Sequence, residues 1–241
     1  MNSNLALSEE GTNKTVIITG ANGNLGSAVT KDFLDKGYKV IATVAIESMK
    51  NDIAAHENIE VVVVDLTNEE ATGSFIQQTI DKYKTIDAAL LLVGGFAMGN
   101  IEATPIADIH KQLSLNFNTA YNVARPLFKH MLQHNEGRIV FVGARPSLEA
   151  AAGKGLVAYG LSKSLLFKLA EYMNEEAKGK NVVTTVVVPS TLDTALNRKS
   201  MPDANPDNWV KPSALAAILE FAVNGVATPL RETVLKVYNN A

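Results

Sequence analysis

Short runs of β-branched and other apolar residues alternate with longer segments of helical periodicity along almost the whole chain. Seven runs predict strands, at residues 15–19, 40–44, 61–64, 88–93, 138–142, 182–188 and 233–237. Five segments with apolar residues three and four positions apart predict helices, at residues 24–36, 69–83, 106–134, 159–178 and 212–224. Continuous apolar strands are typical of a parallel sheet that is buried on both faces. The alternation therefore predicts an α/β fold, a doubly wound parallel sheet with helices on both faces.

The length of the chain and its one irregular segment predict how this fold is organised. A chain of 241 residues is long enough for one α/β domain, which we expect to span residues 13–241. Residues 1–12 lack the basic and apolar regions of a secretory signal, and we expect a flexible tail there. Residues 193–211 interrupt the alternation with two prolines and several Asn and Asp residues. A loop of this length is often a lid over a site, with a surface loop of no role as the alternative.

Charge and cysteine content exclude several classes of function. The formal net charge is -3 and the basic residues are scattered, so we expect neither a nucleic acid nor a membrane as a partner. The chain contains no cysteine, which excludes disulfides and thiolate metal sites and favours a cytoplasmic location. The histidines are not arranged with carboxylates as metal ligands, and no metal is expected.

A glycine-rich turn between the first predicted strand and the first predicted helix indicates a dinucleotide site. Its residues are Gly20, Ala21, Asn22, Gly23, Asn24, Leu25 and Gly26. Glycines at these spacings let the chain turn sharply, bring the backbone close to a pyrophosphate and pack the helix against the strand. The start of the helix adds free N–H groups and a partial positive charge. We therefore expect a Rossmann-type sheet with NAD or NADP as cofactor; a purely structural turn is the alternative.

Residues after other predicted strands are candidates for the same site. Asp65 and Leu66 follow the third strand, where the carboxylate is placed to accept a hydrogen bond from the adenine amino group. Gly94 and Gly95 follow the fourth strand and let the backbone pass close to the cofactor. A helix cap or a plain turn is the alternative for these positions. The second strand ends in Val-Ala-Ile at residues 44–46, without the charged side chain that would distinguish NAD from NADP, so that choice stays open.

Tyr159 and Lys163 are the strongest candidates for catalysis. They lie four positions apart on a predicted helix, which puts their side chains on one face. A phenol has an ordinary pKa of about 10, and a nearby ammonium group favours its ionised form, so we expect Lys163 to tune Tyr159. Tyr159 would give a proton to the substrate as hydride arrives, while Lys163 would also bind the nicotinamide ribose. Such a pair is common by chance, and its position just after the strand at residues 138–142 gives it weight.

The glycine turn, the Tyr-x-x-x-Lys pair and Asn116 resemble the short-chain dehydrogenase/reductase family over nearly the whole chain. The resemblance implies an NAD(P)-dependent oxidoreductase, with Asn116 as a third catalytic residue in a proton relay. Typical members carry a serine after the fifth strand to bind a substrate carbonyl, whereas this chain has Ala144. Ser147 is close enough in sequence to replace it, with an exposed loop serine as the alternative.

A narrower resemblance, to dihydropteridine reductases, rests on residues 94–100, 143–145 and 159–163 and above all on residues 191–202. Those enzymes lack the serine because a quinonoid pterin takes a hydride and a proton but presents no ordinary ketone. The resemblance implies that Phe96 lies against the pterin ring, with core packing as the alternative.

The same region of the chain supplies the remaining candidates and one departure. Pro189 and Leu192, around the end of the sixth strand, are expected to shape the nicotinamide pocket, with a bare turn as the alternative. The acidic residue that dihydropteridine reductases carry after the second strand aligns with Val44, so their preference for NADH does not transfer.

Three functions follow from these residues. The first is an NAD(P)H-dependent reductase of a quinonoid dihydropteridine or a related small molecule; the second is a carbonyl or alcohol dehydrogenase, which Ala144 disfavours. The third is a protein that senses NAD(P) without turnover, which the intact Tyr159 and Lys163 pair disfavours. Pairing of the long predicted helices across a two-fold axis would give a homodimer or homotetramer.

Overall fold

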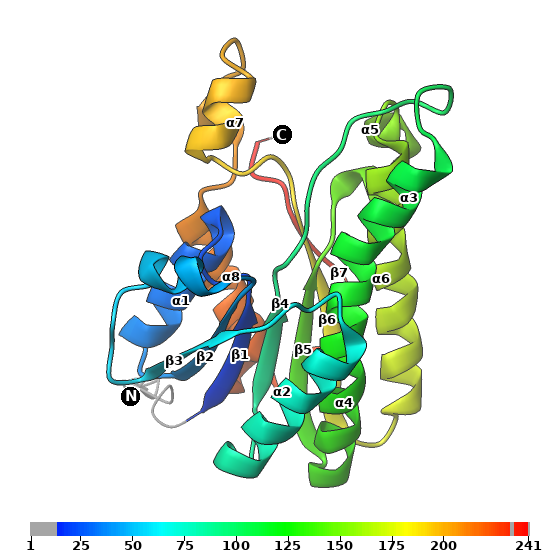
Figure 1. Cartoon of the computed structure of the whole chain (residues 1–241). Coiled ribbons are helices and arrows are strands. Elements are labelled where there is room, and N and C mark those ends of the chain that lie inside the picture. The colour runs from blue at the N-terminus through cyan, green and yellow to red at the C-terminus, as the bar shows by residue number, and fades with distance from the viewer. Residues whose placement is uncertain (1–13, 232–233, 241) are drawn as a thin grey trace, which may run out of the picture.

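Seven parallel strands form one sheet in the part of the chain that the structure describes. The computed structural model describes residues 14–231 and 234–240 (Figure 1), so the tail expected at residues 1–12 lies outside it. The strands are β1 (Thr15–Thr19), β2 (Lys39–Val44), β3 (Ile59–Val63), β4 (Ala88–Leu91), β5 (Glu136–Val142), β6 (Asn181–Pro189) and β7 (Val234–Val237). Their order is β3-β2-β1-β4-β5-β6-β7, with every neighbouring pair parallel. The predicted doubly wound sheet is confirmed.

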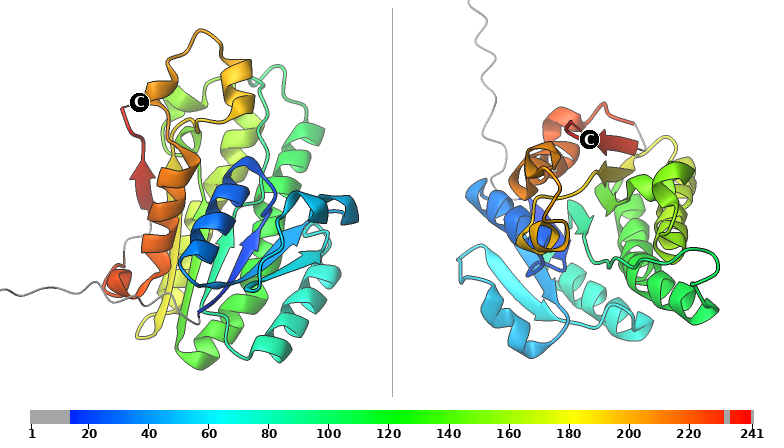
Figure 2. Two further views of the ribbon diagram at one scale, coloured as in Figure 1. Left: turned by 90° about the vertical axis from the view of Figure 1, so that its left-hand side faces the viewer. Right: turned by 90° about the horizontal axis from the view of Figure 1, so that it is seen from above.

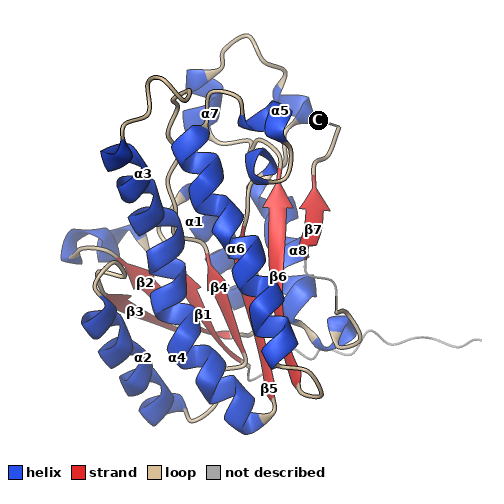
Figure 3. Ribbon diagram, turned by 90° about the vertical axis from the view of Figure 1, so that its right-hand side faces the viewer, coloured by secondary structure: helices blue, strands red, loops and turns tan. Residues whose placement is uncertain are grey.

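Helices cover both faces of this sheet because successive strand residues point to opposite faces. In β1, Ile17 belongs to one apolar core, while Val16 and Ile18 belong to the other. The first core also takes in α2 (Glu69–Tyr83), α4 (Thr119–His134) and α6 (Val157–Glu176), which lie in front of the sheet in Figure 3. The second takes in α1 (Asn24–Asp35) and α8 (Pro212–Val223) behind it. Burial on both faces explains the unbroken apolar runs of the strands.

The predicted segments are present, with boundaries displaced by a few residues. The strand expected at residues 88–93 ends at Leu91. Beyond that point the Leu92 and Val93 N–H groups donate to Thr19 Oγ1, at 2.9 and 3.3 Å, and so leave the ladder of the sheet. The last predicted strand begins at residue 233, which lies outside the described residues. These shifts leave the topology unchanged.

The long helix predicted at residues 106–134 is interrupted. It consists of α3 (Ile106–Leu113), a wider π-helical turn at Ser114–Asn118, and α4. A π-helical turn inserts one extra residue into a helix and often occurs at functional sites. Here it contains Asn116, which is fully buried.

The lid predicted at residues 193–211 contains α7 (Ala195–Ser200) and a 3₁₀ turn at Pro206–Asn208. Its two arms meet at the base, where the Asp193 N–H donates to Val210 O at 2.8 Å. Trp209 is buried there. Figures 1 and 2 show α7 beyond the carboxyl ends of the strands, across from α3 and α5 (Ala150–Gly153). Of the helices described, none is long and apolar enough to cross a membrane.

Candidate active site

In the turn between β1 and α1, the backbone at Gly26 lies directly against the backbone of Gly20 and Ala21. Gly20 has a φ of +64°, and a Cβ there would lie 3.1 Å from Val93 Cγ2. A Cβ on Gly26 would lie only 2.1 Å from the Gly20 carbonyl oxygen. The Ala21 N–H donates to Thr43 O at 3.1 Å and ties the turn to the end of β2. Glycine at positions 20 and 26 is therefore required by the sharp turn and by the contact of helix with strand.

The first turn of α1 is left without a cap from the protein. Its N-cap residue, Gly23, has no side chain to accept a hydrogen bond, and the first turn contains no acidic residue. Asn22, Asn24 and Leu25 belong to the same end of the helix. A helix start carries a partial positive charge and unpaired N–H groups, which fit a phosphate. This end of α1 therefore fits the phosphates of a dinucleotide.

Asp65 and Leu66, after β3, face different surroundings. Asp65 is exposed, and its Oδ1 accepts hydrogen bonds from the Thr67 hydroxyl and N–H, at 2.7 and 2.9 Å. These bonds lower the pKa of the Asp65 carboxyl, so it is ionised at neutral pH. Leu66 is buried in the core, and its carbonyl accepts a hydrogen bond from Asn122 Nδ2 at 3.0 Å. The turn role weighed for Asp65 is present in the structure, and its contact with adenine stays a prediction.

Asn116 holds the Gly94–Gly95 turn against the interrupted helix. Its Oδ1 accepts a hydrogen bond from the Gly95 N–H at 2.8 Å, and its Nδ2 donates to the Gly95 carbonyl at 3.0 Å. Nδ2 also lies 2.8 Å from Gln112 Oε1 and 3.0 Å from Ser162 Oγ. The amide thus positions the turn after β4, and a part for Asn116 in proton transfer stays a prediction.

Lys163 reaches from α6 to the ends of β4 and β5. Its Nζ donates to the Val142 carbonyl at 2.8 Å, and the residue is only 5% exposed. A Cβ on Gly94 would lie 3.0 Å from this Nζ and 2.7 Å from Asn116 Oδ1. The structure therefore brings together three residues predicted from separate motifs, and it explains why position 94 is glycine.

Burial sets the ionisation of both catalytic candidates. It raises the pKa of Tyr159 to about 12 and lowers the pKa of Lys163 to about 8. Desolvation disfavours the charged form of each group, which explains the opposite directions. The Lys163 ammonium group donates to Val142 O, and burial is the cause of the raised pKa at Tyr159; tuning of the Tyr159 phenol by Lys163 stays a prediction. A phenol that stays protonated at neutral pH suits a proton donor in a reduction.

Phe96, Ala144 and Ser147 are the residues that the sequence predicts to face a substrate. The Phe96 ring is 63% exposed and meets the Tyr159 ring edge to face, with centroids 5.2 Å apart. It is therefore not packed in the core. Ala144 is buried, and the Ser147 hydroxyl donates to the Gly160 carbonyl at 3.0 Å. Ser147 thus links the loop after β5 to α6, and its contact with a substrate stays a prediction.

Pro189 and Leu192 precede residues 193–211, the predicted lid. Pro189 is the last residue of β6, and the Leu192 carbonyl accepts a hydrogen bond from Asn197 Nδ2 at 2.8 Å. The half-buried Leu192 side chain packs against the second core. These contacts hold the start of residues 193–211 in place. A lid role for that segment and the part of both residues in a nicotinamide pocket stay predictions.

The contacts of Gln112 and Arg145 in this region were not predicted from the sequence. Gln112 is buried and accepts the hydrogen bond from Asn116, four positions later on the helix. Arg145 donates to Glu149 Oε2 at 2.8 Å and lies over the Tyr238 ring, 5.0 Å from its centroid. The four-residue spacing was a signal for Gln112, whereas the contact between residues 145 and 238 has no local signal at all.

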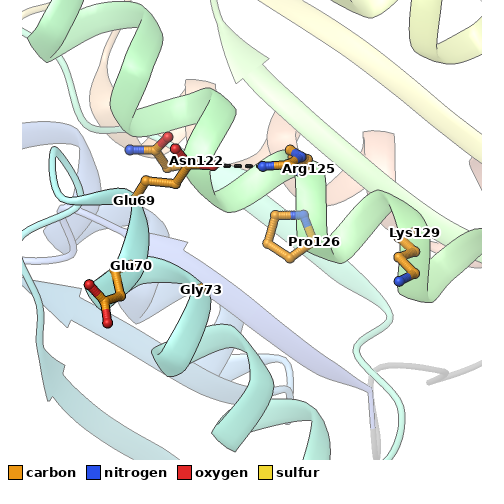
Figure 4. Close-up of a pocket in the computed structure, with 7 residues that line it drawn as sticks. All are labelled: Glu69, Glu70, Gly73, Asn122, Arg125, Pro126 and Lys129. Atoms are coloured by element: carbon orange, nitrogen blue, oxygen red, sulfur yellow. Dashed lines mark hydrogen bonds and ion pairs between the residues drawn. The ribbon is translucent and has the colours of Figure 1, made fainter.

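One hollow in the described residues lies elsewhere, between α2 and α4 (Figure 4). It is a surface cavity of about 720 Å³, and the Arg125–Glu69 ion pair of 2.6 Å crosses its rim. Its lining residues are Glu69, Glu70, Gly73, Asn122, Arg125, Pro126 and Lys129, and none of them was a predicted site residue. Over residues 14–231 and 234–240, no group of His, Asp and Glu side chains is arranged to hold a metal ion.

An open helix start after a glycine turn, with a half-buried tyrosine and a buried lysine at the same edge of the sheet, defines a dinucleotide-dependent oxidoreductase. Comparison with protein families agrees with this class. Residues 14–205 match the model described as short chain dehydrogenase, and the chain belongs to that family.

Individual relatives are more distant. The chain is 27% identical to a dihydropteridine reductase of Dictyostelium discoideum, over 92% of this chain and 94% of that protein. It is 25% identical to an acetoacetyl-CoA reductase of Acinetobacter sp. (strain RA3849), over 76% of each chain. A solved structure, ElxO with NADP bound, has a TM-score of 0.86 at 22% identity and covers 93% of this chain and 96% of its own. This last likeness shows the fold.

Proposed function

We propose that this oxidoreductase reduces a quinonoid dihydropteridine, or a closely related cyclic compound, with Tyr159 as the proton donor. The observation that carries the proposal is the loop after β5, where Ala144 leaves no hydroxyl at the position that usually polarises a ketone. A substrate reduced at a ring nitrogen or a conjugated ring has less need of that group. Similarity to a dihydropteridine reductase over nearly the whole chain supports the same substrate class.

A bound NADH or NADPH supplies the hydride in this reaction. The family of the chain and the NADP-bound state of ElxO support this class of cofactor, as does the open start of α1. Tyr159 is protonated at neutral pH, since even an ordinary phenol has a pKa of about 10, and so it has a proton to give to the reduced substrate; burial raises its pKa to about 12. Lys163 is held beside Gly94, where its ammonium group can bind a ribose hydroxyl.

The exposed Phe96 ring beside Tyr159 supports a flat ligand with an apolar part. Phe96 presents an exposed ring at an angle of 67° to the Tyr159 ring. Met98 and Leu196 are also largely exposed, on the loop that follows Phe96 and on α7 of the lid. Exposed apolar groups near a polar reacting centre are typical of a ligand site.

The test compares two substrates with one purified protein. Oxidation of NADH and NADPH is followed with a quinonoid dihydropterin and, separately, with an acetoacetyl thioester, the substrate class of the second relative. We expect turnover with the pterin and a loss of at least about a hundredfold in kcat for Tyr159→Phe, because general acid catalysis contributes this much. Faster turnover of the thioester would replace the pterin assignment with a carbonyl reductase. Tight dinucleotide binding without turnover of either would favour a sensor.

We also propose that the protein is a homodimer or homotetramer of the cytoplasm. Leu161, Leu165 and Tyr172 are exposed on α6, and Tyr121 is exposed on α4. Apolar groups repeated on neighbouring helices support burial against a second copy. Light scattering coupled to size-exclusion chromatography should give a mass at least twice that of the monomer. The Leu165→Glu variant should have a lower mass.

A further inference from the structure

The dinucleotide expected here exists with and without a 2′-phosphate, and the residues that meet the adenosine ribose decide between the two. Proteins that use NAD commonly place a carboxylate at the end of the second strand, where it accepts a hydrogen bond from the ribose 2′-hydroxyl. In this chain that strand ends in Val44, which is buried. In the structure a different carboxylate, that of Asp52, lies at the same edge of the sheet.

A short 3₁₀ helix, Glu47–Asp52, follows β2, and its last residue turns back to the glycine turn. Asn22 Nδ2 donates to Asp52 Oδ2 at 3.1 Å, across thirty positions of sequence. The Ala21 N–H joins the same two segments through Thr43 O at 3.1 Å. Asp52 is therefore fixed beside the turn that fits the dinucleotide phosphates.

The loops at this edge of the sheet carry a net negative charge. The three crossovers that meet there, residues 20–26, 44–52 and 64–68, contain the carboxylates of Glu47, Asp52 and Asp65 and a single ammonium group, that of Lys50. Lys50 Nζ pairs with Glu47 Oε1 at 2.9 Å, so the one cation already has a carboxylate partner. Asp52 is held by a neutral amide, and Asp65 by the hydroxyl and N–H of Thr67. Neither of these two negative charges is neutralised by those contacts.

We propose that Asp52, held against the glycine turn by Asn22, makes this protein prefer NADH to NADPH. The carboxylate accepts a hydrogen bond from a ribose 2′-hydroxyl and repels a 2′-phosphate. Repulsion of a doubly charged phosphate by one carboxylate a few ångströms away in water corresponds to about a tenfold difference in affinity. The inference rests on the use of a nicotinamide dinucleotide, and not on the identity of the reduced substrate.

The test measures dissociation constants rather than turnover. NADH and NADPH are titrated by their own fluorescence, and NAD and NADP by calorimetry, in about 50 mM salt. We expect the wild type to bind NADH at least about tenfold more tightly than NADPH. Asp52→Asn should bring that ratio close to one by tightening NADPH, and Asp52→Lys should invert it. Raising the salt to about 0.5 M should shrink the ratio, since the effect acts between exposed charges.

Two further variants separate a local effect from a general one. Asp35→Asn removes an exposed carboxylate at the far end of α1, where Asp35 pairs with Lys31, and should leave the ratio at its wild-type value. Glu47→Gln releases Lys50 from its partner and should strengthen NADPH binding. A wild type that binds NADPH as tightly as NADH, or an Asp52→Asn protein with an unchanged ratio, would overturn the proposal. So would a wild type that binds neither dinucleotide, whereas failure to reduce pterins would leave it intact.

Discussion

The helices α1 and α2 begin at the same edge of the sheet, yet their first turns are built in opposite ways. The N-cap of α2 is Asn68, whose side chain accepts a hydrogen bond from the Ala71 N–H at 3.0 Å. Glu69 and Glu70 add two acidic residues to its first turn. The N-cap of α1 is Gly23, with no capping side chain and no acidic residue in the first turn.

The difference fits the binding role predicted for the start of α1 and a structural role for the start of α2. At α2 the protein's own oxygens meet the N–H groups and the positive end of the helix dipole, which stabilises the fold. At α1 the same groups are left for an anion, and the fold forgoes that stabilisation. Single substitutions can therefore add a cap to the start of α1 or remove the cap from α2. We expect the first kind to change dinucleotide binding and the second to change stability.

The largest effect is expected from Gly26→Val. Its Cβ would lie 2.1 Å from the Gly20 carbonyl oxygen and 2.9 Å from Ala21 Cα, so the backbone of the turn has to move. We expect dinucleotide affinity to fall by more than about a hundredfold, with a loss of stability of about 2 kcal/mol or more. Calorimetric titration and thermal melting measure the two effects.

The matched control is Gly73→Ala, in the first half of α2. A Cβ at position 73 meets nothing within 4 Å. Alanine should stabilise that helix by about 0.5–1 kcal/mol and leave the dinucleotide affinity unchanged. Equal loss of affinity in both variants would contradict the contrast between the helices.

Gly23→Asp gives α1 the kind of cap that α2 already has. The new carboxylate would accept the first-turn N–H groups and repel the phosphates, so we expect dinucleotide affinity to fall by about ten- to thirtyfold. Gly23→Asn adds similar bulk without the charge, so its dinucleotide affinity should fall less. Similar losses in the two variants, measured in low salt, would assign the effect to bulk alone.

Lys163 resembles the start of α1 in that it lowers the stability of the fold. The cost here comes from burying the ammonium group of its side chain. Its pKa is lowered to about 8 in the folded protein from 10.5, so the folded state disfavours the ammonium form. The destabilisation is present in full below about pH 8 and disappears as the pH rises towards the unfolded value of about 10.5. Lys163→Met should therefore raise the stability of the ligand-free protein at pH 7 by about 1–3 kcal/mol, and by much less near pH 10.

Denaturant titrations at the two pH values test this expectation. Lys168→Met is the control, since Lys168 lies on the same helix with its side chain 57% exposed. It should change stability little at either pH. A Lys163→Met protein that is less stable than the wild type at pH 7 would show that the hydrogen bond to Val142 O outweighs the desolvation of the ammonium group.

The smallest effect is expected from Asn68→Ala. It removes the side chain that caps α2 and should lower the free energy of unfolding by about 1 kcal/mol. Dinucleotide affinity should not change, because the predicted phosphate site lies at the start of another helix, α1. Asn68→Asp keeps the cap and should keep the stability, and a loss of affinity in either variant would argue against two separate roles.

Much of the fold followed from local patterns. Each predicted strand is present in the described residues because a run such as residues 182–188 is apolar on both faces and suits only a buried parallel strand. The π-helical turn at Ser114–Asn118 was missed, since the apolar spacing of α3 and α4 continues through it. The short β4 was overestimated because the Thr19 hydroxyl, far away in sequence, takes two N–H groups from the end of the strand.

The sequence by itself determined the parallel sheet, the glycine turn and the Tyr159 and Lys163 pair, because spacings of two to four residues on a strand or helix decide them. The tertiary structure alone decided how those residues behave. It directed Lys163 Nζ to Val142 O, raised the pKa of Tyr159 through burial, and turned Asp52 back to Asn22. Desolvation and contacts between distant segments exist only after the chain has packed, so no local pattern contains them.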